Sequence, residues 1–174
     1  LLNFTSSFTE KYQEKHGQLP VVVSDPDWLS PCEQGASSDE ENFWKPIEID
    51  ENLTFNNVEK ALDIVLHDDF KAYFTCFFSE SIDASCSEGE LSLLFPWSKG
   101  DFERLQQNLI GHIMMKQRLK QDITLFFAVT DEEDMIISID NESGEVWVEL
   151  VGCQPHKKLA NNVTEFIESL SVSL

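Results

Sequence analysis

The sequence predicts a single α+β domain, residues 1–174, in which a mixed, mostly antiparallel sheet packs against several helices. A length of 174 residues suits one domain with its own core, and a hydrophobic content of 41%, with 13 Phe and 4 Trp, favours a packed globule over disorder. Segments with helical spacing of apolar residues alternate with strand-like segments. Three strand-like segments near the C-terminal end are joined by short links, which indicates an antiparallel meander.

The N-terminal half is expected to contain three helices and one irregular stretch. Phe4, Phe8 and Tyr12 recur at helical spacing, and Gly17 suits the C-terminal cap of this first helix. Residues 18–46 contain four prolines and are expected to be irregular. Apolar residues at helical spacing predict two further helices: Val58, Leu62 and Val65 mark one, and Phe70, Tyr73, Phe74, Phe77 and Phe78 mark the other. The aromatic side chains of that second helix are expected in the core.

The clearest helix follows a strand predicted at residues 91–95. Ser98 is a plausible N-cap with Asp101 three residues later, as in a capping box with Asp in place of Glu. The apolar stripe of this helix consists of Phe102, Leu105, Leu109 and Ile113. Its last turn carries the cations Lys116, Arg118 and Lys120, which the helix dipole favours. We therefore expect these three side chains to have a local structural role.

The expected meander consists of strands at residues 123–129, 135–139 and 146–150. Its two connections are short and acidic, at residues 131–134 and 141–144, and the second contains a glycine. A last helix is predicted by apolar residues on one face: Leu159, Val163, Phe166, Ile167 and Leu170. There is no internal repeat.

Charge is distributed very unevenly along the chain. There are 32 acidic residues against 12 basic ones, a formal net charge of -20. Residues 121–156 contain no lysine or arginine but nine carboxylates: Asp122, Asp131, Glu132, Glu133, Asp134, Asp140, Glu142, Glu145 and Glu149. Such a bias speeds encounters with basic partners and disfavours nucleic acid, whose phosphates would be repelled. Acidic surfaces also keep soluble proteins apart, so any single carboxylate is weak support for a binding site.

Motifs for catalysis, metal binding or cofactor binding are absent from the sequence. The four histidines, His16, His67, His112 and His156, have no metal-ligand spacing, and neither G-x-S-x-G nor a phosphate-binding glycine loop occurs. Asp131 and Glu142 have the span of an EF-hand loop, but Ile136 occupies the position that requires glycine. We therefore expect no enzyme, no cofactor and no metal. An enzyme that uses a pair of carboxylates in a cleft is retained as an alternative.

The sequence indicates a cytosolic protein with reduced thiols. Neither a membrane-spanning apolar run nor a signal-peptide pattern is present. The four cysteines, Cys32, Cys76, Cys86 and Cys153, lie far apart without a C-x-x-C pair. Four Asn-x-Ser/Thr sequons, at Asn3, Asn52, Asn141 and Asn162, would suit a secreted glycoprotein, but we interpret them as coincidental.

A set of short motifs runs through nearly the whole chain in order. The central ones are Trp97-Ser98, Asp101-Phe102, Arg104, Asn108-Leu-Ile-Gly-His112, Lys116-Gln-Arg-Leu-Lys120 and Thr124-Leu-Phe. Others are Ser30-Pro-Cys32, Trp44 with Pro46, Val58-Glu59, Asp63-Ile-Val65, Glu132-Glu133, Ser143-Gly-Glu-Val146, Leu159-Ala160 and Glu165-Phe166. In these motifs the chain resembles the Syd family of proteins that interact with SecY, the translocation channel. The first helix and residues 33–42 fit the family only loosely.

The resemblance implies a non-enzymatic protein that lies on the cytoplasmic side of the inner membrane by binding SecY. It also implies a role as a quality-control or negative regulatory factor for SecY that is not properly assembled. Syd proteins are similar in turn to Smi1/Knr4-like domains, which include toxin-immunity proteins. The alternative function is therefore an immunity or nucleic-acid-mimic protein that neutralises a basic toxin or nuclease.

The expected binding site is an acidic surface that receives the basic cytoplasmic loops of SecY. We expect the protein to act as a monomer whose membrane association is indirect, through SecY. The carboxylates predicted to form the surface lie near strand turns and helix starts: Asp63, Asp68, Asp69, Glu88, Glu90, Asp101, Asp131, Glu133, Asp134 and Glu142. Trp44 and Trp97 are predicted as aromatic anchors within this charged rim.

Overall fold

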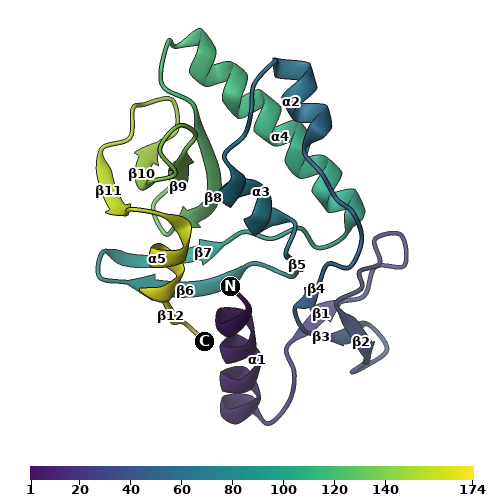
Figure 1. Ribbon diagram of the computed structural model, residues 1–174. Helices are drawn as coiled ribbons and strands as arrows, with labels where there is room; N and C mark the ends of the chain where they lie inside the picture. Colours follow the sequence, from purple (N-terminus) through teal and green to yellow (C-terminus); the bar gives the residue numbers. More distant parts are fainter.

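A curled, seven-stranded antiparallel sheet organises the protein, and the computed structural model describes all of residues 1–174 (Figure 1). In spatial order its strands are β11 (Lys157–Ala160), β10 (Val146–Leu150), β9 (Met135–Asp140), β8 (Thr124–Thr130), β7 (Gly89–Leu93), β6 (Ile82–Cys86) and β12 (Ser171–Val172). Every neighbouring pair is antiparallel. The predicted α+β class and the predicted meander, β8–β9–β10, are confirmed. Lys157 in β11 forms an ion pair with Glu88 in the β6–β7 turn, so the curl brings these two segments together.

Five helices surround this sheet, three of them before β6 and two after β7: α1 (Leu2–His16), α2 (Asn56–Leu62), α3 (Asp68–Phe74), α4 (Lys99–Arg118) and α5 (Val163–Glu168). The core between helices and sheet is largely aromatic. Phe70 of α3 packs against Phe74 at a centroid distance of 5.0 Å, and Tyr73 packs against Phe127 of β8 at 5.2 Å. No helix is at once long enough and apolar enough to span a bilayer.

A second, smaller sheet lies at the right of Figure 1, apart from the large one. It contains β1 (Val21–Val23), β3 (Glu41–Trp44) and β2 (Glu33–Ala36), in the spatial order β1–β3–β2. A short ladder of β4 (Ile47–Glu48) and β5 (Phe77–Phe78) follows it in the chain. The prediction that residues 18–46 are irregular was therefore wrong. These strands have at most four residues, too few for an alternating pattern to be recognised, and prolines flank them.

Helix α1 agrees with prediction, because Gly17 caps it in the left-handed region at φ 72°. The next two helices are shorter than predicted. Helix α2 stops at Leu62, since Asp63 turns the chain at φ 50°, and the side chain of Val65 is therefore 75% exposed rather than buried. Phe77 and Phe78 are buried as expected, but they lie in strand β5 and not in a helix.

Helix α4 has the expected N-terminus. Ser98 Oγ accepts a hydrogen bond from Asp101 N at 3.3 Å, and Asp101 Oδ2 accepts one from Trp97 N at 2.8 Å. Of the three cations expected to have a local structural role, Lys116 is completely buried, where it meets Glu149 of β10.

The last helix, α5, is limited to six residues. Leu159, expected on it, lies in strand β11, and Leu170 follows the helix. Asn162, expected within the helix, is its N-cap and accepts a hydrogen bond from Glu165 N at 2.8 Å.

Candidate acidic binding site

The predicted acidic residues do not form one continuous surface. The meander is antiparallel, so its two turns, at residues 131–134 and 141–145, lie at opposite ends of the sheet. Strand β9, with six residues between them, separates the turns by roughly 20 Å at the usual strand rise. The structure therefore divides the predicted carboxylates into separate groups.

The first group, here called the turn group, lies where the β6–β7 turn meets the β8–β9 turn. Leu91 pairs with Thr130 across the β7–β8 ladder, so Glu88 and Glu90 come close to Asp131 and line a shallow pocket with it. Glu88 is neutralised by its ion pair with a lysine of β11, whereas Asp131 is exposed and has no ion-pair partner. Two further predicted residues, Glu133 and Asp134, are exposed on the same β8–β9 turn.

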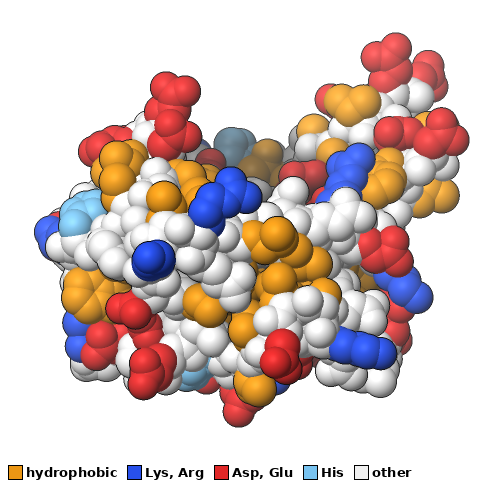
Figure 2. Space-filling model, turned by 90° about the horizontal axis from the view of Figure 1, so that it is seen from above, with side chains coloured by type: hydrophobic (Ala, Val, Ile, Leu, Met, Phe, Trp, Pro, Cys, Tyr) orange, Lys and Arg blue, Asp and Glu red, His pale blue; other side chains and the backbone are white.

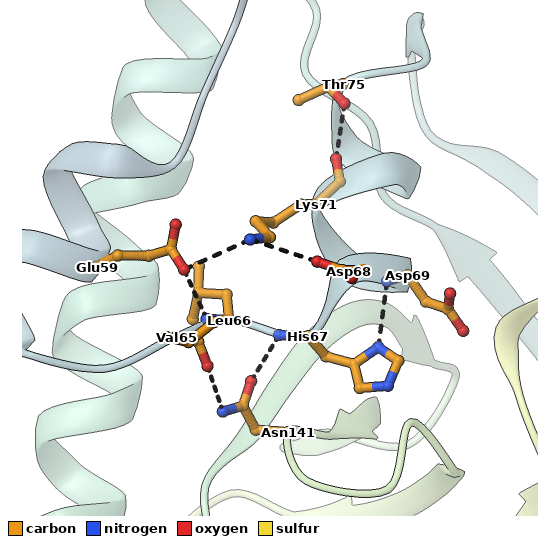
Figure 3. A network of polar contacts seen from close by, with 9 residues as sticks. All are labelled: Glu59, Val65, Leu66, His67, Asp68, Asp69, Lys71, Thr75 and Asn141. Carbon is orange, nitrogen blue, oxygen red and sulfur yellow. Dashed lines mark hydrogen bonds and ion pairs between the residues drawn. The ribbon is translucent and has the colours of Figure 1, made fainter.

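The second group, the clamp group, consists of Asp63, Asp68, Asp69 and Glu142. Asn141, in the β9–β10 turn, holds the parts of this group together (Figure 3). Its side-chain amide donates to the carbonyl of Val65 at 2.9 Å, and its carbonyl oxygen accepts from His67 N at 2.9 Å. The turn that carries Glu142 is therefore fixed against the loop from Asp63 to Asp69.

Much of the polar chemistry in the clamp group serves the fold. Lys71 lies 3.5 Å from a carboxylate oxygen of Glu59 and 3.5 Å from one of Asp68, so Asp68 is partly neutralised. Glu59 also accepts a hydrogen bond from a backbone amide of the clamped loop at 2.9 Å (Figure 3). His67 Nδ1 accepts from Asp69 N at 3.1 Å and caps helix α3. Because Asp68 already has a cationic partner, it is less available to an external cation.

The third group lines a cleft between the small sheet and the rest of the protein. Only Asp101 was predicted here; the structure adds Asp25, Glu33 and Glu80. Phe95 and Trp97 also line the cleft, as do Val22, Val23, Trp28 and the serines at positions 79 and 81, and its volume is about 280 Å³. In Figure 2, a lobe carrying several carboxylates rises at the right, and the surface between it and the body is hollowed. We call these residues the acidic cleft.

The carboxylates of the acidic cleft differ in how they are held. Glu33 accepts hydrogen bonds from Ser30 N, at 2.9 Å, and from the side chain of Asn42, while Asp101 caps α4 as described above. Glu80 is half-buried, and no cation lies within ion-pair distance of it. Burial raises the pKa of Glu80 above its ordinary value, and the nearby charge of Asp101 raises it further. An incoming ammonium or guanidinium group therefore stabilises such a carboxylate more than it stabilises an exposed one.

The edge of the acidic cleft is partly apolar. Val23 is 71% exposed, and Leu29 is exposed nearby in sequence. The guanidinium of Arg104 lies 4.3 Å from the ring centroid of Trp28, in cation–π geometry. Carboxylates beside aromatic and aliphatic groups suit a lysine or arginine side chain, whose long apolar stem ends in a charge.

Trp44 and Trp97, predicted as aromatic anchors, are both buried. Trp44 is 5% exposed and Trp97 is 8% exposed, and their rings meet edge to face at 5.9 Å. Trp44 also stacks on Phe8 of α1 at 5.6 Å. Their burial follows from this packing, which joins the small sheet to α1 and to the body. Trp97 still forms part of the cleft wall.

Residues 121–156 contain no lysine or arginine, but two of their carboxylates form ion pairs with lysines from outside the stretch. Lys116 Nζ, from helix α4, lies 3.2 Å from Glu149 Oε1, and Lys158 Nζ lies 2.9 Å from Glu145 Oε1. Both lysines lie outside the stretch and are brought to it by the fold. Local sequence could not reveal either pair.

A buried network surrounds Glu149. Burial raises its pKa, but the ammonium of Lys116 and the hydroxyl of Thr124, which donates to Glu149 Oε1 at 2.9 Å, oppose this shift. His112 Nε2 lies 3.1 Å from the same hydroxyl, and burial, aided by Lys116, lowers the pKa of His112 to about 4. At neutral pH the imidazole of His112 is therefore neutral, and it lies beside the ion pair of Lys116 and Glu149. No set of three or more His, Cys, Asp or Glu side chains anywhere in the structure is arranged to hold a metal ion.

Comparison with known proteins identifies the family. A sequence profile described as "Syd protein (SUKH-2)" matches residues 1–171 of the chain. The chain belongs to the Syd family. A relative named Protein Syd from Colwellia psychrerythraea is 54% identical over 180 residues, covering 98% of this chain and 90% of that protein. Protein Syd from Alteromonas mediterranea is 47% identical, covering 97% of this chain and 92% of that protein. Protein Syd from Aliivibrio salmonicida is 40% identical, covering 98% and 93% respectively.

Sequence reasoning missed three of the four carboxylates in the acidic cleft of this Syd-family chain. Asp25 and Glu33 lie in the region expected to be irregular, and Glu80 follows the aromatic residues that were assigned to a helix. One local signal was available: Glu80 stands between two serines just after an apolar run. That pattern marks the end of a strand, but it does not say what the carboxylate faces.

Proposed function

We propose that this protein binds basic segments in the cytoplasmic loops of SecY, and that the acidic cleft is where a lysine or arginine enters. One observation supports this most strongly: four carboxylates line the cleft, and none of its 11 lining residues is lysine, arginine or histidine. Cytoplasmic loops of membrane proteins are rich in lysine and arginine, so a channel's cytoplasmic face has the complementary charge.

The remaining predicted carboxylates, in the turn and clamp groups, are proposed to steer the partner rather than to hold it. A net charge of -20 raises association rates with a basic surface by roughly 10- to 1,000-fold at low salt. Screening over about 8 Å at physiological ionic strength confines this attraction to the final approach. Residence time then depends on the desolvated contacts inside the cleft.

In this proposal the protein is a monomer on the cytoplasmic side of the inner membrane, attached indirectly through SecY. It acts without catalysis, as a quality-control or negative regulatory factor for incompletely assembled channels. The chemistry of the cleft supports binding more than catalysis, because its carboxylates lie beside aromatic rings and serine hydroxyls, and its lining includes no histidine, lysine or arginine.

The test is co-sedimentation of the protein with SecY-containing inner-membrane vesicles over a range of salt concentrations. The variant Asp25→Asn with Glu80→Gln removes two cleft charges that cap no helix. Its matched control, Asp68→Asn with Glu142→Gln, removes two charges from the clamp group. We expect the cleft variant to lose binding by about tenfold or more, as for charged groups desolvated in an interface, and the control to change it by less than about threefold.

Equal effects of the two variants would show that binding depends on net charge and not on the cleft. Binding that does not weaken as salt rises would contradict the electrostatic mechanism. A pull-down that recovers a basic soluble toxin or nuclease, together with no binding to SecY vesicles, would favour the immunity function instead.

A further inference from the structure

Strand β1 is an edge strand with one side open. It pairs with β3 alone, through Val21 with Phe43, Val22 with Asn42 and Val23 with Glu41. Its three residues are all valine, a residue that favours strands. Native proteins usually protect such an edge with charges, prolines or a covering segment.

The hydrogen bonds of β1 to β3 define which of its backbone groups are free. Trp44 N donates to the carbonyl of Pro20 at 2.9 Å, and Ser24 N donates to the carbonyl of Glu40 at 2.9 Å. In an antiparallel ladder the groups that face the partner alternate along the strand. The amide and carbonyl groups of Val21 and Val23 therefore point away from β3, toward the open edge.

This open edge belongs to the acidic cleft. Val22 and Val23 line the cleft, as does Asp25, two residues after the end of the strand. Glu80 and Asp101 line the same cleft. Free backbone donors and acceptors, exposed valines and unneutralised carboxylates thus occur together at one place.

We propose that the partner's basic segment binds in an extended conformation, as an added strand along the open edge of β1. Its backbone hydrogen-bonds to Val21 and Val23, and lysine or arginine at alternate positions points toward Glu80 and Asp101. Main-chain pairing supplies affinity in this mode of recognition, and alternate side chains supply specificity. The inference rests on the proposed function, because it assumes that a basic segment enters the cleft.

The charge of the site favours this occupant over a second copy of the chain. Two copies joined edge to edge through β1 would bring eight cleft carboxylates together, four from each, without a cation among the lining residues. Like charges opposed across an interface cost several kcal/mol. A basic strand has the opposite sign and fits the same edge.

The experiment uses a fluorescein-labelled hexapeptide of alternating arginine and valine, with the intact protein and a fluorescence anisotropy readout. A second peptide of the same sequence is methylated on every backbone nitrogen, which preserves its charge and removes its hydrogen-bond donors. We expect the methylated peptide to bind more weakly by at least roughly tenfold, since several backbone hydrogen bonds are lost.

Two variants test the same contact from the protein side. Val23→Pro removes an outward-facing amide that β3 does not use, and Val23→Thr is the matched control that retains it. Loss of a single hydrogen bond predicts a decrease in affinity of roughly 2- to 10-fold for the proline variant relative to the threonine variant. Circular dichroism checks the fold of both, and the peptide comparison remains decisive if the proline variant unfolds.

The outcomes separate this inference from the proposed function. Equal binding of both peptides, weakened for both by Glu80→Gln, would overturn strand addition and leave the cleft as the site for basic groups. No binding of either peptide would also overturn it, and SecY-vesicle binding would then decide the proposed function alone. Concentration-dependent dimers in analytical ultracentrifugation, abolished by Val23→Pro, would assign the edge to a second copy.

Discussion

The buried pair of Lys116 and Glu149 yields the most demanding prediction about stability. Replacing Lys116 with methionine keeps a long side chain in the same space but removes the ammonium group. The carboxylate of Glu149 is then left fully buried without a cation, and the hydroxyl of Thr124 still donates to it at 2.9 Å. Gln121 and the carbonyl of Cys153, which accept from Lys116 at 3.1 and 2.8 Å, also lose their donor.

The magnitude follows from what remains unpaired. Breaking a buried ion pair by removing one partner costs about 3–5 kcal/mol, because an uncompensated charge stays in the interior. A domain of ordinary stability has about 5–15 kcal/mol in total, so Lys116→Met is expected to remove a large part of it. The double variant Lys116→Met with Glu149→Leu removes both charges, and it should recover most of this loss. Its residual cost comes from the polar groups that lose a partner.

Urea denaturation, followed by far-ultraviolet circular dichroism at neutral pH, measures these differences. Arg118→Met is the matched control, because Arg118 is an exposed cation near the end of the same helix, and it should change the free energy of unfolding by less than about 0.5 kcal/mol. The reasoning would be refuted if Lys116→Met cost no more than Arg118→Met, or if the double variant were as unstable as the sum of the single ones.

Three further predictions concern pH and local order. His112 is held neutral with a pKa of about 4 against an ordinary 6.5, so protonation favours the unfolded chain. The free energy of unfolding therefore falls by about 3 kcal/mol as the pH drops from 6.5 to 4. His112→Gln should flatten this pH dependence in urea titrations, and an unchanged slope would contradict the prediction. The pKa of Glu80 is raised, so its ionised form opposes folding above about pH 4.5. Glu80→Gln should therefore increase the urea midpoint at pH 7 but not at pH 4. A lower midpoint at pH 7 would contradict the expected effect of burial. Asn141→Ala removes both clamp hydrogen bonds and should lower the free energy of unfolding by about 1–3 kcal/mol. Hydrogen exchange at the amide of His67 should become faster in this variant. Glu142→Ala, at the neighbouring residue, should leave that exchange unchanged.

The parts of the fold that sequence predicted well are those with long periodic patterns. Helix α4 has 20 residues and strand β8 has seven, so each repeats its apolar period often enough to be recognised. The aromatic run from Phe70 to Phe78 was placed correctly in the core but divided wrongly. Strand β5 has only two residues, and it is defined by pairing with β4 some 30 positions earlier in the chain.

The sequence predicted an acidic surface, but it did not predict which carboxylates the fold brings together. Composition showed that the chain is strongly acidic, and Asp101 was selected for its position at a helix start. Asp25 and Glu80 come together with it only through the packing of the small sheet against the body. The burial of Lys116 could not be predicted either, because a lysine near a helix end gives no local sign that its charge is buried against β10.

The aromatic contacts at the small sheet also give the protein a built-in optical signal. Of its four tryptophans, Trp28 and Trp97 line the acidic cleft, and Trp44 touches Trp97. Indole emission responds to nearby charge and to exclusion of water. A cation that enters the cleft should therefore change the intrinsic fluorescence, so occupancy can be followed on the unlabelled protein during a titration.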